Sequence, residues 1–138
     1  PLRRQRQMCI RDSNSNLYGI SNVEQAFSAF LVMNSHGLTP KEYKNFLYGK
    51  LLDQEQRLLG QKLSIILAIA EALDESHEQF IKHLEVNIKY TSVAIKVFYL
   101  EGRDVSVTKA AVEKLFKSFK KEFKKSLEIE WHESRKEA

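Results

Sequence analysis

The 138-residue sequence predicts an α+β fold, in which a helical part comes first and a small β-β-α-β subdomain follows. Apolar residues recur at helical spacing from residue 21 to about residue 74. From Leu84 to Tyr99 they instead alternate with polar residues, as in half-buried strands. A second helical stretch then leads to a last alternating segment at residues 127–131. Helices and strands are thus segregated along the chain.

Capping signals place the beginnings of three helices. A capping box at residues 21–24 begins the first, which is expected to end at Gly37. Thr39 is a good N-cap for the second. Asp53 is expected to cap the third, which runs to about Asp74 and is apolar on most of its sides. A helix of that kind is normally buried, so it should form the centre of the helical part.

A hairpin is predicted where the period changes to two. The segments Leu84–Tyr90 and Val93–Tyr99 alternate around a short turn, so the hairpin should have one buried face. The sequence "EGRD" at residues 101–104 marks the next turn. A long amphipathic helix over Val107–Phe123 and a strand at 127–131 complete this part.

The composition is that of an ordinary globular chain, with 43% hydrophobic and 29% charged residues. The longest apolar run, residues 63–70, is too short to span a bilayer, which needs about 20 residues. No apolar segment typical of a secretory signal follows the basic N-terminus, and the single cysteine cannot form an internal disulfide. We therefore expect a cytoplasmic location and no membrane partner.

The first residues differ in kind from the rest. The stretch "RRQRQMCIRDS" (residues 3–13) resembles, codon by codon, the translated adapter of a transposase-based sequencing library. Its four arginines and one aspartate contribute 4 − 1 = +3 of the net charge of +4, so the remainder is nearly neutral. We therefore expect a non-native segment joined to an environmental (metagenomic) gene fragment, rather than a nucleic-acid-binding arm. The expected segments are 1–13 (adapter-derived), 14–83 (helical), 84–131 (β-β-α-β) and 132–138 (tail).

Self-sufficient catalytic motifs are absent from the sequence: there is no glycine-rich phosphate loop, nucleophile elbow or Cys/His pair. The acids Glu71, Asp74 and Glu75 could hold a divalent cation or act as acid and base. Solvation of the end of an apolar helix explains them better, so no metal site is predicted. The histidines lack metal-ligand spacing and are interpreted as surface or loop residues. They are His36, His77, His83 and His132.

Seven lysines crowd the last predicted helix. Such a strip can attract a polyanion, for example polyphosphate or nucleic acid. It can equally be the solvated face of an amphipathic helix, with cations favoured near the C-terminus. Glu113 and Glu122 interrupt the strip, which favours the solvated face. The functional hypothesis places a polyanion on Lys114, Lys117 and Lys121.

Several stretches carry a resemblance to a known family. "LSIILAIAEALDESH" (63–77) and "HLEVNI" (83–88) are similar to the C-terminal region of the exopolyphosphatase / guanosine pentaphosphate phosphatase family (Ppx/GppA), where a helix reading roughly "LSAILRIADALDRSH" precedes a "DLKVEI" strand. "FKKEFKKSLEIE" (119–130) resembles the family's closing segment, and "NSNLYGISNVEQA" (14–26) resembles a stretch that follows its His-rich helix. The resemblance covers about residues 14–131.

The resemblance implies a fragment of a cytoplasmic hydrolase that releases terminal phosphate from inorganic polyphosphate or from pppGpp. Catalysis in that family belongs to N-terminal actin-like lobes with Mg²⁺, which this sequence lacks. The fragment is therefore expected to have no catalytic residue and no cofactor of its own. The family's C-terminal region is a degenerate HD-like helical bundle followed by a small α/β part, which implies a homodimer and a channel for a long anionic substrate.

Individual positions follow or depart from the family pattern. Ser76 and His77 match a family pair, which implies either ligand contact or a buried capping role. Glu71 falls on the last acid position of the degenerate HD site, where the family usually has aspartate. Ala68 and Glu75 stand where the family has arginine, which removes positive charge from this helix.

Two further expectations complete the sequence analysis. A bundle without its first helices should expose one flank of the helix over Leu63–Leu73, and this predicts poor solubility or self-association of the chain. The alternative function is a stand-alone helical binding module that contacts nucleic acid or an acidic protein through its lysine-rich last helix. The near-neutral charge of the remainder makes nucleic acid the less favoured partner.

Overall fold

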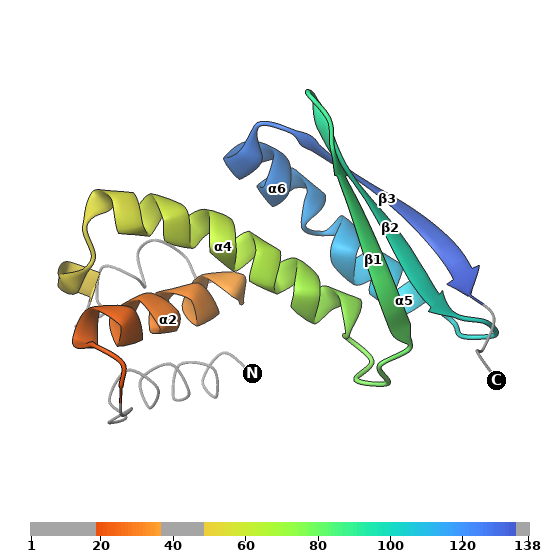
Figure 1. Ribbon diagram of the computed structural model, residues 1–138, viewed down its shortest axis with the longest axis horizontal. Helices are drawn as coiled ribbons and strands as arrows, with labels where there is room; N and C mark the ends of the chain where they lie inside the picture. Colours follow the sequence, from red (N-terminus) through yellow and green to blue (C-terminus); the bar gives the residue numbers. More distant parts are fainter. Residues whose placement is uncertain (1–18, 37–48, 135–138) are drawn as a thin grey trace. The chain divides into compact units, whose positions relative to one another are not determined.

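The computed structural model describes residues 19–36 and 49–134 and confirms the α+β class. The predicted Gly37 cap, the helix predicted to begin at Thr39 and the adapter-like segment lie outside these ranges. The helices come first, and a β-β-α-β order follows (Figure 1). The elements are α2 (Asn22–Ser35), the 3₁₀ turn η1 (Gly49–Leu51), α4 (Gln54–Leu73), β1 (Ile81–Ile88), β2 (Ser92–Leu100), α5 (Ser106–Glu113), α6 (Phe116–Phe123) and β3 (Ser126–Ser134).

The chain divides into two compact units, one up to Ala68 and one from Ile69 onward, so α4 contributes to both. The sequence-based domain limits at residues 13, 83 and 131 stay predictions. Within the described ranges, no helix is both long and apolar enough to cross a membrane.

The first unit shows how local sequence begins its helices. The Ser21 hydroxyl accepts a hydrogen bond from the Glu24 amide at 3.3 Å, and the Glu24 carboxylate accepts one from the Ser21 amide at 2.8 Å. The predicted capping box is therefore confirmed. At the start of α4, Asp53 and Gln56 make the same reciprocal pair, at 2.8 and 3.0 Å. Asp53 thus caps this helix as predicted.

The core of the first unit lies between α2 and the start of α4. Ala26, Phe30 and Leu52 are buried together, and Phe27 packs against them. Gly60 of α4 lets the ring of Phe30 approach the helix backbone directly. This close approach fixes where α2 contacts α4.

The prediction that the third helix is apolar and buried on most sides is wrong for one flank of α4. Leu58, Leu59 and Ile66 are each about half exposed. The buried side is the one with Gly60 and Ser64, because the core residues of α2 lie there. Ile66 lies within Leu63–Leu73, the segment for which the sequence predicts one exposed flank.

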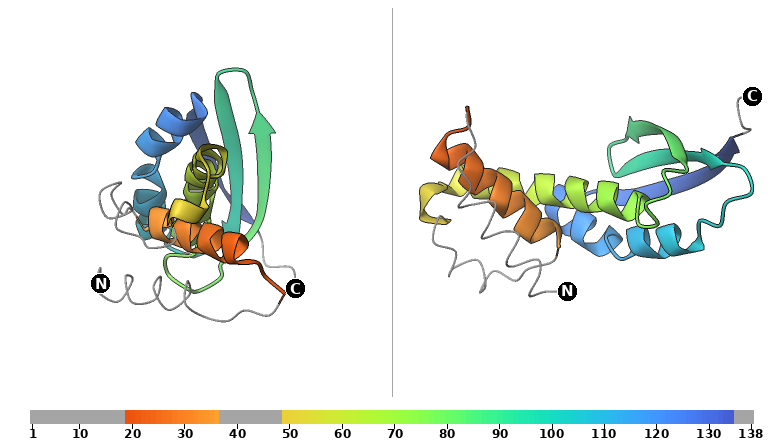
Figure 2. Two further views of the ribbon diagram at one scale, coloured as in Figure 1. Left: turned by 90° about the vertical axis from the view of Figure 1, so that its left-hand side faces the viewer. Right: turned by 90° about the horizontal axis from the view of Figure 1, so that it is seen from below.

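The second unit is built around a three-stranded sheet in the order β1-β2-β3. β1 pairs with β2 in antiparallel fashion, and β2 pairs with β3 in parallel. A parallel pair needs a crossover, and α5 and α6 supply it. Figure 2 shows β1 at the border of the sheet. The central strand therefore has neighbours on both sides, whereas β1 has one.

The helical crossover packs on one face of the sheet. Phe80, Tyr99 and Val105 form a buried cluster, against which Trp131 of β3 packs. The Lys109 ammonium of α5 lies over the Trp131 ring, 5.6 Å from its centroid. These contacts fix α5 against β2 and β3.

The single long helix predicted over Val107–Phe123 is divided into α5 and α6. The Leu115 amide donates to the Val112 carbonyl at 2.9 Å, a tight i→i+3 bond that interrupts the α-helical pattern. Neither glycine nor proline stands at the break. Lys124, with φ of 56°, then ends α6 in a left-handed conformation.

Two predictions about the strands need correction. β1 and β2 form the expected hairpin, but the apolar residues of β1 are not buried. β1 is the edge strand, and the crossover helices pack against β2 and β3. β3 also extends to Ser134, beyond the strand predicted at residues 127–131. The Glu101 amide donates to the Ser134 carbonyl, and the Ser134 hydroxyl donates to the Tyr99 carbonyl.

Candidate functional site

The predicted site residues fall into two groups in the second unit. Glu71, Ser76 and His77 belong to the end of α4 and the loop that leads to β1. The predicted lysines Lys114, Lys117 and Lys121 belong to α6 and the turn before it. In the described part of the chain, no hydrogen bond or ion pair joins Ser76 or His77 to these lysines.

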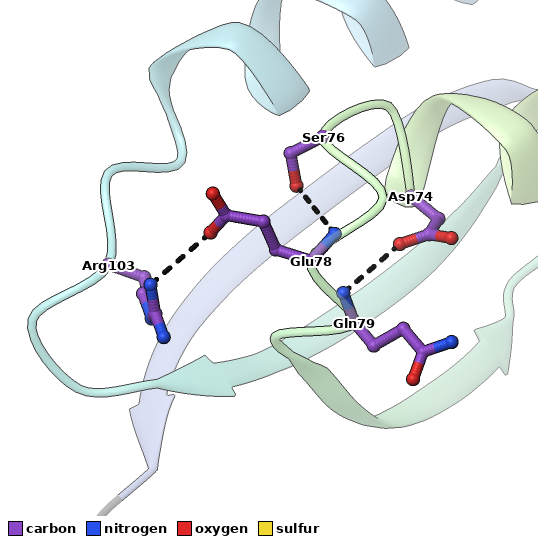
Figure 3. A network of polar contacts seen from close by, with 5 residues as sticks. All are labelled: Asp74, Ser76, Glu78, Gln79 and Arg103. Carbon is purple, nitrogen blue, oxygen red and sulfur yellow. Dashed lines mark hydrogen bonds and ion pairs between the residues drawn. The ribbon is translucent and has the colours of Figure 1, made fainter.

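The loop between α4 and β1 is held by its own polar groups (Figure 3). The Ser76 hydroxyl accepts a hydrogen bond from the Glu78 amide at 3.4 Å, and the Asp74 carboxylate accepts one from the Gln79 amide at 3.3 Å. These bonds satisfy backbone donors in a turn where Gln79 adopts a φ of 54°. Ser76 therefore has a capping role, although it is exposed and not buried as that hypothesis supposed.

His77 projects from the same loop into solvent. Its φ is 57°, in the left-handed region, and its side chain is 89% exposed. Its Nδ1 atom lies 3.9 Å from a carboxylate oxygen of Asp74. A buried capping role for His77 is therefore wrong.

Arg103 is a neighbour of this loop that the sequence did not indicate. Its Nη1 atom lies 3.3 Å from the Glu78 carboxylate and joins the β2–α5 turn to the α4–β1 loop (Figure 3). The two residues are 25 positions apart, and "EGRD" was interpreted only as a turn. The loop thus gains a guanidinium group, but the acids of the same region, Glu71, Asp74, Glu75 and Glu78, outnumber it.

Glu71, the position corresponding to the degenerate HD acid, is exposed in the last turns of α4. Among residues 19–36 and 49–134, no three histidine, cysteine, aspartate or glutamate side chains converge as a metal-ligand set. Nothing in the described chain therefore assigns Glu71 to a cation.

The lysines of the crossover form an exposed basic face, which we call the lysine face: Lys114, Lys117, Lys120, Lys121 and Lys124. On the opposite side of α6, Phe119 is buried and stacks on Phe123 with ring centroids 4.5 Å apart. From Ser106 to Lys125 there are seven lysines and two glutamates, so the local charge is 7 − 2 = +5. Within the described ranges, none of the five lysines of this face makes an ion pair.

Two other lysines of the crossover have structural contacts instead. Lys109 lies over Trp131, as described above. The Lys125 ammonium donates to the Lys89 carbonyl at 2.7 Å, and the Lys89 ammonium lies 3.2 Å from the Glu128 carboxylate. Hydrogen bonds from Ser92 and from Lys89, with the charge of Lys89, hold the pKa of Glu128 below its ordinary value. These contacts tie the start of β3 to the β1–β2 turn.

The chemistry open to the lysine face is electrostatic attraction rather than catalysis. Exposed ammonium groups bind phosphate as mobile point charges, and the binding weakens as salt rises. The structure thus brings the three predicted lysines together on one exposed surface, and it leaves Ser76 and His77 in a separate, acidic loop. No family model matches this chain, and no curated protein matches it.

Proposed function

We propose that this chain is a C-terminal fragment of a phosphatase that releases terminal phosphate from inorganic polyphosphate or pppGpp. The fragment serves dimerisation and guidance of the polyanion, and catalysis belongs to cytoplasmic parent lobes that hold Mg²⁺ outside this chain. The proposal is supported by the resemblance of residues 63–77, 83–88 and 119–130 to the exopolyphosphatase / guanosine pentaphosphate phosphatase family. The helix-then-β-β-α-β order agrees with that resemblance.

The observation that carries the polyanion role is the lysine face. Five exposed ammonium groups without ion pairs in the described chain stand on the side of the crossover turned away from its aromatic contacts. A long phosphate chain can contact several of them at once and release counterions from each contact. Ser76 and His77 are a secondary hypothesis, because the acids around them repel a polyanion.

Titration with fluorescently labelled polyphosphate, followed by anisotropy at two salt concentrations, tests this role. The variant Lys117→Gln/Lys121→Gln removes two charges from the lysine face. The slope of log affinity against log salt concentration should become shallower by about one to two, because fewer counterions are released. The matched control, Lys62→Gln/Lys82→Gln, removes two exposed charges from α4 and β1 and should leave the slope nearly unchanged. An equal loss in both double variants would contradict the proposal.

The alternative of a stand-alone binding module rests on the same face. It predicts that double-stranded DNA or an acidic protein competes with labelled polyphosphate at least as well as unlabelled polyphosphate does. Weak competition by DNA at both salt concentrations would favour the phosphatase fragment.

A further inference from the structure

The border strand β1 carries a row of apolar side chains that are partly to mostly exposed in the described chain. Leu84, Val86 and Ile88 are 41%, 59% and 71% exposed, and Tyr90 at the turn is 95% exposed. By register, Leu84 lies beside Val97 of β2, which is 0% exposed. The apolar face of the sheet therefore continues from buried residues of the central strand onto an exposed edge.

The backbone of β1 also has an open side. The Lys89 amide donates to the Ser92 carbonyl at 2.8 Å, so Lys89 belongs to a pair that turns its peptide groups toward β2. Because such pairs alternate in an antiparallel ladder, Asn87 and Glu85 do the same. Val86 and Ile88 then turn their amide and carbonyl groups outward, where the described sheet has no further strand. An edge of this kind is a template for another strand.

We propose that β1 pairs in antiparallel fashion with β1 of a second copy of this chain and thereby forms a continuous six-stranded sheet. The inference deepens the dimerisation role in the proposed function and rests on it for its biological purpose. It concerns β1 alone, so it does not depend on the lysine face. The identity of the strand that pairs with β1 follows from the pattern of charges along β1.

Only some registers keep the apolar faces of the two copies on the same side. The two-fold axis that relates the two copies must pass between a residue of β1 and the same residue of the second copy. A shift by one residue would set apolar side chains beside polar ones. An axis at Glu85 or at Lys89 places a charge opposite the same charge, which is destabilising. An axis at Val86 or at Ile88 leaves no glutamate opposite a lysine.

An axis at Asn87 is the register that joins opposite charges. Glu85 then faces Lys89 of the second copy, whose ammonium also contacts Glu128 of its own chain, and the symmetry repeats this pair on the other side of the axis. Val86 faces Ile88 of the second copy, so the apolar rows also meet. Opposite charges directly across a ladder stabilise the pairing of the two strands. This strand is therefore complementary to itself in one register.

A cysteine scan in the full chain tests both the partner and the register. In a Cys9→Ser background, Asn87→Cys places two thiols across the axis in a pair without hydrogen bonds, where Cα atoms are about 4.5 Å apart and a disulfide can form. Under mild oxidation, Asn87→Cys should form a covalent dimer at least about tenfold faster than Glu85→Cys or Lys89→Cys alone. A mixture of the last two variants should link to each other.

Three outcomes would overturn the inference. Equal linking of Glu85→Cys with itself would contradict the register, and a chain that sediments as a monomer with no linking of Asn87→Cys would contradict the dimer. Ile88→Lys, at an exposed position, should retain the circular-dichroism spectrum and shift the sedimentation coefficient to that of the monomer. A dimer that persists in Ile88→Lys but dissociates in Ile66→Lys would place the association on α4 and also overturn the inference.

Failure of this test is distinguishable from failure of the proposed function. Polyphosphate titration of the monomeric Ile88→Lys variant measures the lysine face without the dimer. Retained polyphosphate binding beside an absent dimer would reject the strand pairing alone.

Discussion

The ring of Phe30 in α2 occupies the space that a β-carbon at Gly60 of α4 would need. An added β-carbon would lie 2.5 Å from the Phe30 Cδ1 atom and 3.3 Å from the Phe27 Cε2 atom. Phe30 is itself buried, so its ring has little room to withdraw. A glycine in the middle of a helix normally costs stability, and here it permits the contact between two helices.

Gly60→Ala is therefore expected to destabilise the protein in spite of its better helix propensity. Overpacking costs about 1–3 kcal/mol, whereas the propensity gain is about 1 kcal/mol. Urea unfolding measures the difference. Gln61→Ala, at an exposed neighbour, is the control and should be neutral or slightly stabilising. The double variant with Phe30→Leu should recover part of the loss, because the smaller side chain frees the space.

The capping box of α2 should make stability depend on pH. The pKa of Glu24 is lowered, first by the hydrogen bond from the Ser21 amide and then by that from its hydroxyl. Because the folded-state pKa lies below the unfolded one, the stabilisation is present above the unfolded pKa and is lost as pH falls through the folded one. Glu24→Gln should flatten this acid-side loss in unfolding curves recorded between about pH 6 and about pH 3.

Ser21→Ala should lower the free energy of unfolding by about 1 kcal/mol at neutral pH, because it leaves a helix amide without its acceptor. Ser28→Ala, within the same helix, removes a hydroxyl that donates to a helix carbonyl and is not a cap. It serves as the control and should change stability less. A larger effect at Ser28 would contradict the importance of the cap.

Tyr99 should produce a loss of stability in alkaline solution. Burial raises the pKa of Tyr99, and the negative charge of Glu133 and its hydrogen bond with the phenol raise it further. A raised pKa means that the stabilisation is complete below the unfolded pKa and is lost as pH rises through the folded one. Tyr99→Phe should remove this alkaline loss and cost about 1 kcal/mol at neutral pH. Tyr90→Phe, at an exposed tyrosine, should change neither quantity.

The ion pair between Arg103 and Glu78 is expected to contribute little to stability. Both side chains are about half exposed, and exposed pairs of this kind contribute about 0–1 kcal/mol. Arg103→Gln should therefore leave the unfolding midpoint nearly unchanged. If the same variant weakens polyphosphate binding, the polyanion surface extends to the α4–β1 loop, and unchanged binding confines it to the lysine face.

The sequence predicted the elements whose signals are local. Ser21 and Asp53 cap helices through bonds to residues three positions away, so the pattern contains both partners. The alternation in β1 and β2 likewise predicted the hairpin. Burial of the β1 face could not be predicted from the same alternation, because it depends on which strand the crossover helices cover.

The positions of the candidate site residues were likewise predictable only where the signal is local. The lysine face follows from spacing along one helix, so Lys117 and Lys121 were placed together correctly. The contact of Arg103 with Glu78 depends on the approach of two turns that are distant in the sequence, and no local pattern contains it. The break at Leu115 was also missed, because no glycine or proline marks it.

The parallel pairing of β3 with β2 has a consequence for synthesis. The hairpin can form as soon as Leu100 has left the ribosome, whereas Ser126, the partner of Ser92, is made only after the whole crossover. Until then β2 has a second open edge, and Val97, fully buried in the finished unit, lacks its neighbour Trp131. The nascent chain therefore passes through a period in which both borders of the hairpin can capture other strands.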